Sequence, residues 1–109
     1  MSEIKNLTEK IKQFNKDRDW DQFHNPKDLA MALNIESSEL LELFLWKRNE
    51  DVNIEKVKHE LADVFMYALN IADKFDLDIT DIVNEKLAIN ATKYPVEKAK
   101  GTSKKYSDL

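Results

Sequence analysis

Apolar residues recur at helical spacing along most of this chain, and this pattern predicts an all-α fold. In the first segment Ile4, Leu7, Ile11 and Phe14 lie three or four positions apart, which predicts a helix over roughly 2–17. No stretch shows the alternation of apolar and polar residues that is typical of a strand. We therefore expect a bundle of helices rather than a mixed fold.

Two further helices follow a loop that carries aromatic residues. Asn25 before Pro26 is a favourable N-cap and first-turn pair, so a helix is predicted over about 26–47. A short polar connector separates this helix from the next, which is predicted over about 54–74. A short connector between two long helices favours antiparallel packing.

A fourth helix is bounded by residues that start and stop helices. Asp78 is suited to cap its first turn, and Pro95 directly after Tyr94 predicts its end. Beyond it the sequence is charged and weakly patterned. We therefore expect one domain over residues 1–97 and a charged, flexible tail over 98–109.

Three glutamates interrupt the apolar pattern of the second predicted helix. At about 100° per residue, Glu36 falls within the apolar stripe, Glu39 at its edge and Glu42 nearly opposite. A carboxylate on a core-facing stripe is costly to desolvate. Glu42 is therefore interpreted as a solvated residue, whereas Glu36 and Glu39 are expected to face inward. The stripe consists of Leu29, Leu33, Leu40 and Phe44.

The third predicted helix repeats this arrangement of acidic residues beside an apolar side. Glu60, Asp63 and Tyr67 lie together on one face, with Glu60 and Asp63 three positions apart. The expected core side of the helix consists of Leu61, Val64, Phe65, Ala68, Leu69 and Ala72.

Antiparallel packing of these two helices would bring both acidic pairs together. Four carboxylates in one cleft repel one another unless cations lie between them. Ligands that are all oxygen select hard ions, so Mg²⁺ is expected, with Mn²⁺ as a substitute. The alternative is that these residues are ion-paired glutamates on the rim of a helical bundle, in a chain of which 35% is charged.

Composition narrows the possible classes of function. The 109 residues fit one domain, and the net charge of −4 does not favour a protein that binds nucleic acid through a basic surface. Without cysteine there are no disulfides or thiolate metal sites, and two histidines are too few for a histidine-rich zinc site. No apolar run approaches the length of a membrane span, and we expect a cytoplasmic protein.

The sequence resembles the MazG-like superfamily of all-α nucleoside triphosphate pyrophosphohydrolases, in the branch that acts on dCTP. The resemblance rests on an ExxE…ExxD pattern, here Glu36, Glu39, Glu60 and Asp63, and covers roughly residues 10–101. Further matching segments are "RDWDQFH", "ELLELFLW", "ELADVFMYAL" and "KLAINATKYPVEKAKG".

The resemblance implies Mg²⁺-dependent hydrolysis of dCTP or a modified dCTP to the monophosphate and pyrophosphate, in a role of cleansing the nucleotide pool. The four carboxylates would bind the metal and through it the triphosphate. A related enzyme with dUTP, dATP or broad preference remains open. A non-catalytic helical oligomerisation module is the alternative of another class.

The family builds its base pocket from aromatic residues, and by position these would be Trp20, His24, Trp46 and Tyr67. Flat rings stack on a base, and indole or imidazole nitrogens can hydrogen-bond to its edge. The alternatives are that both tryptophans belong to the core or an interface and that His24 orders its loop.

On the fourth predicted helix Lys86, Asn90 and Lys93 are spaced to share a face. Lys86 and Asn90 match family positions near the substrate, although solvated lysines on an exposed face would show the same pattern. The resemblance also implies a homodimer or homotetramer with sites at subunit contacts, where Trp20 would come from a neighbouring subunit.

Overall fold

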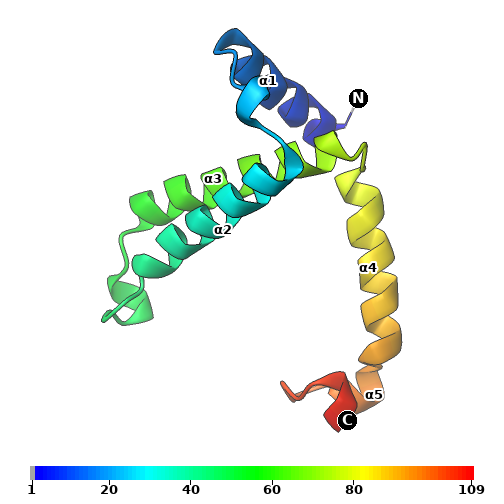
Figure 1. Cartoon of the computed structure of the whole chain (residues 1–109). Coiled ribbons are helices and arrows are strands. Elements are labelled where there is room, and N and C mark those ends of the chain that lie inside the picture. Colours follow the sequence, from blue (N-terminus) through cyan, green and yellow to red (C-terminus); the bar gives the residue numbers. More distant parts are fainter. Residues whose placement is uncertain (1) are drawn as a thin grey trace. The chain divides into compact units, whose positions relative to one another are not determined.

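Residues 2–109 are described by a computed structural model, which contains helices and no strands in this part of the chain (Figure 1). The prediction of an all-α fold is confirmed. The helices longer than one turn are α1 (Glu3–Asp17), α2 (Pro26–Glu42), α3 (Ile54–Lys74) and α4 (Ile79–Lys93). Short helical turns are η1 (Asp21–Phe23), η2 (Asn49–Asp51), α5 (Val96–Ala99) and η3 (Tyr106–Asp108).

Each of the four long helices begins at a polar residue whose side chain accepts a hydrogen bond from a backbone N–H of the first turn. The predicted caps Asn25 and Asp78 accept at 2.8 Å and 3.0 Å. Ser2 and Asn53 cap α1 and α3 in the same way, at 3.1 Å and 3.2 Å. These contacts satisfy donors that a helix leaves unpaired, and they fix where each helix starts.

The second helix ends five residues before the predicted position. After Glu42 the backbone continues in tight turns, in which amides bond to carbonyls three residues earlier, as in the 3.2 Å contact from Lys47 to Phe44. Trp46 has a left-handed backbone with φ of 63°. This conformation ends the helical path without the glycine that usually marks such a stop.

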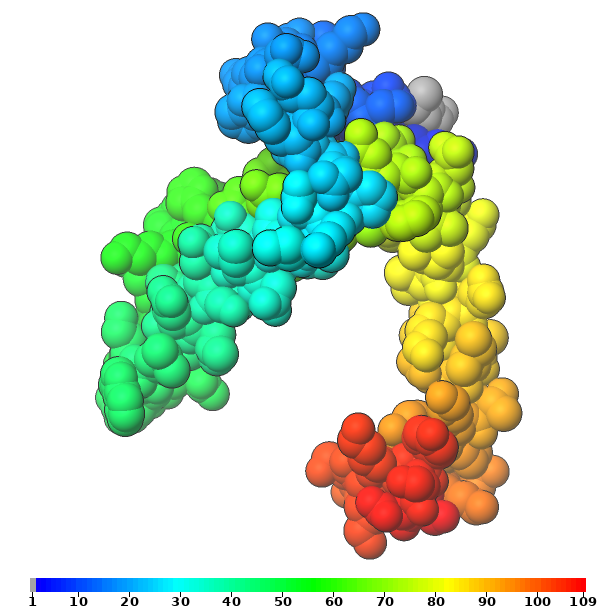
Figure 2. Space-filling view, in the orientation of Figure 1, coloured from blue at the N-terminus to red at the C-terminus, as the bar shows by residue number. Residues whose placement is uncertain are grey.

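The described chain divides into two compact units, one ending at Asp76 and the other running from Leu77 to Leu109. The first unit contains α1, α2 and α3. In it α2 and α3 form an antiparallel hairpin (Figure 1), and the space-filling view shows α2 lying directly on α3 (Figure 2). In the second unit Tyr106 packs edge-on against Tyr94, with ring centroids 6.1 Å apart.

The buried apolar core of the first unit is small. Ile11 of α1, Leu29 of α2, and Leu69 and Ala72 of α3 are buried. The expected core side of α3 is buried only at its C-terminal half, whereas large apolar side chains elsewhere on the hairpin are exposed. These are Met31, Ile35, Leu41, Leu61 and Phe65.

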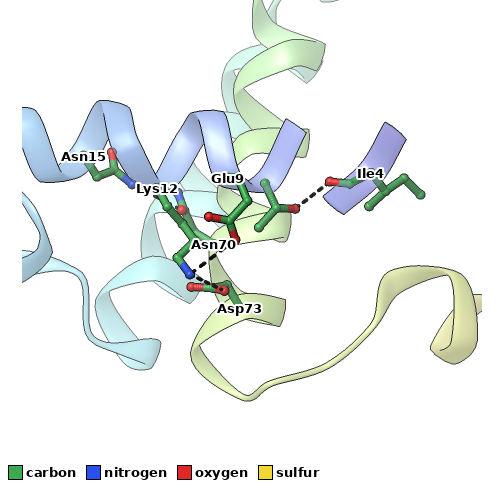
Figure 3. Close-up of polar contacts among 7 residues, drawn as sticks. Ile4, Glu9, Lys12, Asn15, Asn70 and Asp73 are labelled. Atoms are coloured by element: carbon green, nitrogen blue, oxygen red, sulfur yellow. Dashed lines mark hydrogen bonds and ion pairs between the residues drawn. The ribbon is translucent and has the colours of Figure 1, made fainter. Parts of the chain in front are cut away.

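Polar contacts also join α1 to α3 (Figure 3). Lys12 on α1 lies 3.5 Å from Asp73 on α3, and the neighbouring Glu9 lies 3.6 Å from the same ammonium group. These charges raise the pKa of Lys12, with Asp73 as the larger cause. No helix of residues 2–109 is long and apolar enough to cross a membrane.

Candidate active site

The α2–α3 hairpin brings three carboxylates together. Glu36 of α2 and Glu60 and Asp63 of α3 each place one oxygen within 4.8 Å of the others, and all three side chains are partly buried. In an antiparallel hairpin, one turn forward along α2 corresponds to one turn back along α3. Residues spaced three apart on each helix therefore face one another, as the sequence pattern predicts.

Two oxygens of this cluster lack hydrogen-bond partners. Oε2 of Glu36 and Oε2 of Glu60 are buried, and no group within residues 2–109 donates to them. A buried acceptor without a donor is costly, and a buried charge is more so. A cation between the carboxylates would satisfy both oxygens.

Crowding also changes the acid–base properties of the cluster. Burial of the carboxyl, hydrogen bonding to Glu39 and the negative charges of Glu39, Asp63 and Glu60 raise the pKa of Glu36 from 4.5 to about 7. Burial and then Glu39 likewise raise the pKa of Glu60. Both shifts show that the cluster holds negative charge at a cost when no cation is present.

Glu39 occupies a different position from the other three. Its side chain is exposed, and it does not belong to the group of oxygens within 4.8 Å. It nevertheless acts on the pKa values of Glu36 and Glu60, so it lies at the edge of the cluster. Glu42 is exposed and contributes to neither shift, in agreement with its expected place outside the cleft.

These residues fit a hard divalent cation. The donors are carboxylate oxygens alone, which suits Mg²⁺ or Mn²⁺ better than softer metals. Glu36, Glu60 and Asp63 would supply the inner ligands, and Glu39 is placed to join them by a change of side-chain rotamer or through a water molecule.

The cluster opens into a cavity of about 510 Å³ in the first unit. Of the residues predicted for the site, Trp20, His24, Glu36, Asp63 and Tyr67 line it. Other lining residues were not predicted: Lys10, Ile11, Phe14, Asn15, Met66 and Asn70. This volume is in the range of pockets that hold small-molecule ligands.

Trp20 is positioned at this cavity by its own chain. The backbone N–H of Trp20 donates to the carbonyl of Asn15 at 3.0 Å, and its ring meets Phe14 edge to face, with centroids 5.7 Å apart. The guanidinium of Arg18, the residue directly after α1, lies 3.5 Å from the centroid of the Phe14 ring on α1. Trp20 and the carboxylates therefore belong to one chain, in contrast to the expectation that Trp20 comes from a neighbouring subunit.

His24 and Tyr67 also face the cavity. Nδ1 of His24 is buried without a partner among the described residues. Burial, followed by the charges of Glu36, Asp63 and Glu39, raises the pKa of the Tyr67 hydroxyl. Tyr67 therefore keeps its proton at neutral pH and is available as a hydrogen-bond donor beside the cluster.

The remaining predicted site residues lie elsewhere. Trp46 is fully exposed on the turn after α2 and does not line the cavity of its own chain. Lys86, Asn90 and Lys93 lie on α4 in the second unit, where the Nζ of Lys93 is 4.8 Å from the centroid of the Tyr106 ring. Their roles toward a substrate stay predictions.

Among the lining residues that were not predicted, Asn15 and Asn70 stand out by their burial and polarity. Both are buried polar residues that line the cavity, Asn15 on α1 and Asn70 on α3. The available signal was their placement: each interrupts an otherwise apolar helix face, as Glu36 does.

Known proteins resemble this chain in sequence and in fold. The MazG-like family model matches residues 31–109. The chain is 35% identical to dCTP pyrophosphatase 1 of Homo sapiens and of Mus musculus, over 89% of this chain and 62% of each relative. A pyrophosphatase crystal structure from Archaeoglobus fulgidus superimposes with a TM-score of 0.78 at 33% identity, over 87% of this chain and 94% of that one.

Proposed function

The chain belongs to the MazG-like family, and from this premise we propose that it hydrolyses a nucleoside triphosphate to the monophosphate and pyrophosphate. The observation that carries the proposal is a cluster of three close carboxylates, of which Glu36 and Asp63 line the same cavity as the indole ring of Trp20. The likeness to proteins named dCTP pyrophosphatase 1 supports dCTP, or a modified dCTP, as the substrate. The chain spans 62% of the length of those relatives.

The carboxylates and the other residues at the cavity would have different roles. Glu36, Glu60 and Asp63, with Glu39 at the edge, would hold Mg²⁺. When bound, this metal would neutralise phosphate charge and help to ionise or orient the water that attacks the α-phosphorus. Attack there breaks the bond to the oxygen that bridges the α- and β-phosphates, so pyrophosphate leaves.

Side chains around the cluster would bind the nucleotide itself. The Tyr67 hydroxyl, protonated beside the carboxylates, is suited to donate to a phosphate oxygen. The Trp20 ring lines the same cavity and can stack on the base. These contacts orient the nucleotide so that its α-phosphorus lies near the metal ligands, which reduces the entropic cost of the reaction.

We also propose that the functional unit is a homo-oligomer, a dimer or tetramer. The exposed apolar residues of α2 and α3 support it, because a single chain leaves Phe65, Ile35 and Leu61 in water. A homo-oligomer would also explain the position of Trp46. It does not reach the cavity of its own chain, so as a base-pocket residue it would act in the site of a second copy.

The proposal is tested by incubating the purified protein with a panel of dCTP, dUTP, dTTP and dATP, with MgCl₂ or with EDTA. Monophosphate and pyrophosphate should form in equal amounts with Mg²⁺, fastest from dCTP, and Asp63→Asn should form neither. A preference for dUTP or dATP would change the assigned substrate and keep the chemistry. No magnesium-dependent pyrophosphate from any member of the panel would remove the proposed function.

A further inference from the structure

Asn15 and Asn70 are the buried polar residues of the described chain, with 5% and 9% of their surfaces exposed. Asn15 lies on α1 and Asn70 on α3, where they accompany the ion pair of Lys12 and Asp73 (Figure 3). Both asparagines line the cavity that the carboxylates open into. They form an amide pair in which Nδ2 of Asn15 donates to Oδ1 of Asn70 at 3.2 Å.

This amide pair retains most of its hydrogen-bonding capacity. A carboxamide offers two N–H donors and an oxygen with two acceptor sites, and the mutual contact uses one donor and one acceptor site. Neither side chain has a second hydrogen bond within residues 2–109. Their remaining polar atoms are not fully buried, and both residues line the cavity.

Joining α1 to α3 does not by itself explain the amide pair. Lys12 and Asp73 already link the two helices by charge, and Ile11, Leu69 and Ala72 link them by burial. Two apolar side chains of similar size would dock the helices about as well, because replacing both partners of a buried hydrogen bond is nearly neutral. The free donors and acceptors instead match a polar ligand.

The amide pair is also placed where the base of a nucleotide would lie. Asn70 follows Asp63 by two turns on the same face of α3, which is about 10 Å along the helix axis. Tyr67 lies between them, and Trp20 lines the same cavity. This separation is comparable to that between the α-phosphate of a nucleotide and the far edge of its base.

We propose that the Asn15–Asn70 amide pair hydrogen-bonds to the edge of the nucleobase and sets the base preference of the site. The inference rests on the proposed function and adds its specificity element. Adjacent amide N–H and C=O groups complement an edge that carries an acceptor next to a donor, such as the ring nitrogen and exocyclic amine of cytosine. Trp20 would hold the face of the same base without distinguishing its identity.

The test compares base discrimination in the wild type and in the double variant Asn15→Leu/Asn70→Leu. This variant removes both amides, so neither is left buried without its hydrogen-bond partner. The quantity measured is the ratio of kcat/KM for dCTP to that for dUTP within one preparation. This ratio cancels any loss of folded enzyme. We expect it to move toward one by roughly tenfold to a hundredfold, the range for a paired contact to a base edge.

Two further variants separate reading of the base from docking of the helices. Lys12→Met weakens the other α1–α3 contact outside the cavity, and it should lower the melting temperature while leaving the ratio unchanged. Asn70→Asp replaces the free Nδ2 donors of Asn70 with an acceptor. The ring nitrogen of cytosine then loses its donor, whereas the N–H at the same position of uracil gains an acceptor, so the ratio of kcat/KM for dCTP to that for dUTP should fall. If the double variant does not fold, the ratio measured for Asn70→Asp alone tests the inference.

A failure of this inference can be told apart from a failure of the proposed function. If the wild type hydrolyses no triphosphate, the proposed function fails before any variant is compared. If the wild type is active and the ratio is unchanged in both the double variant and Asn70→Asp, the amide pair is only a structural contact and the inference is overturned. An altered ratio in Lys12→Met of the same size would also overturn it.

Discussion

Neutralising Glu36 should stabilise the protein when no metal is bound. The Glu36 carboxylate lies within 4.8 Å of oxygens of Glu60 and Asp63, and one of its own oxygens is buried without a donor. The substitution Glu36→Gln keeps the size of the side chain and removes its charge. Repulsion and desolvation that disfavour the folded state should then be relieved.

The magnitude follows from the pKa of this group. Its rise from 4.5 to about 7 in the folded protein corresponds to at most about 3.5 kcal/mol, at about 1.4 kcal/mol per pKa unit. Because Glu36 is only partly buried, solvent screens its charge, and we expect about 1–2 kcal/mol. The folded state holds a proton that the unfolded chain releases, so the stability of the metal-free wild type should fall as pH rises from about 4.5 to about 7.

The assay is urea unfolding followed by circular dichroism, in EDTA, at one protein concentration and at pH 4.5 and pH 8. Glu36→Gln should gain about 1–2 kcal/mol over the wild type at pH 8 and close to nothing at pH 4.5. The matched control is Glu42→Gln on the same helix, which should change neither value by more than about 0.5 kcal/mol. A Glu36→Gln protein that is less stable than the wild type at pH 8 would refute the reasoning, because Glu36 would then be held by a favourable contact.

Three other predictions concern activity. Glu39→Ala and Asp63→Ala should abolish pyrophosphate release and keep a helical circular dichroism spectrum, with Glu42→Ala near wild type; an active Asp63→Ala enzyme would exclude the metal site. Trp20→Ala should raise KM about tenfold to a hundredfold, since stacking contributes about 1–3 kcal/mol; a lowered melting temperature with unchanged KM would make Trp20 structural. When Trp46→Ala and Asp63→Ala chains are mixed and form dimers, about a quarter of the sites should have all wild-type residues. A mixture of Trp20→Ala and Asp63→Ala chains should have no such site. The reverse result would mean that Trp46 acts in the site of its own chain and Trp20 in the site of the second copy.

Local features of the sequence predicted most of the helices. A cap is made by residues three positions apart, so Asn25 and Asp78 mark helix starts without knowledge of the tertiary fold. Periodicity placed Glu36 and Asp63 on faces that meet, because a short connector leaves antiparallel packing as the simple arrangement. The predicted end of α2 was wrong because Trp46 adopts a left-handed backbone at a position where the sequence has no glycine or proline.

Features that depend on distant contacts were not predictable. Asn15 and Asn70 are 55 positions apart, and their pairing requires the docking of α1 against α3. The apolar residues Leu61 and Phe65 looked like core, yet they are exposed in the single chain. Periodicity identifies an apolar face but not whether the same chain or another one covers it.

The central claim is that this cavity directs water to the α-phosphorus of a nucleoside triphosphate. Its most direct test is hydrolysis of dCTP by the wild-type protein with Mg²⁺ in water enriched in ¹⁸O, with the products analysed by mass spectrometry. The label should appear in the phosphate of dCMP, and pyrophosphate should stay unlabelled. Label in pyrophosphate would place the attack at the β-phosphorus, and formation of dCDP and phosphate would contradict the proposed reaction altogether.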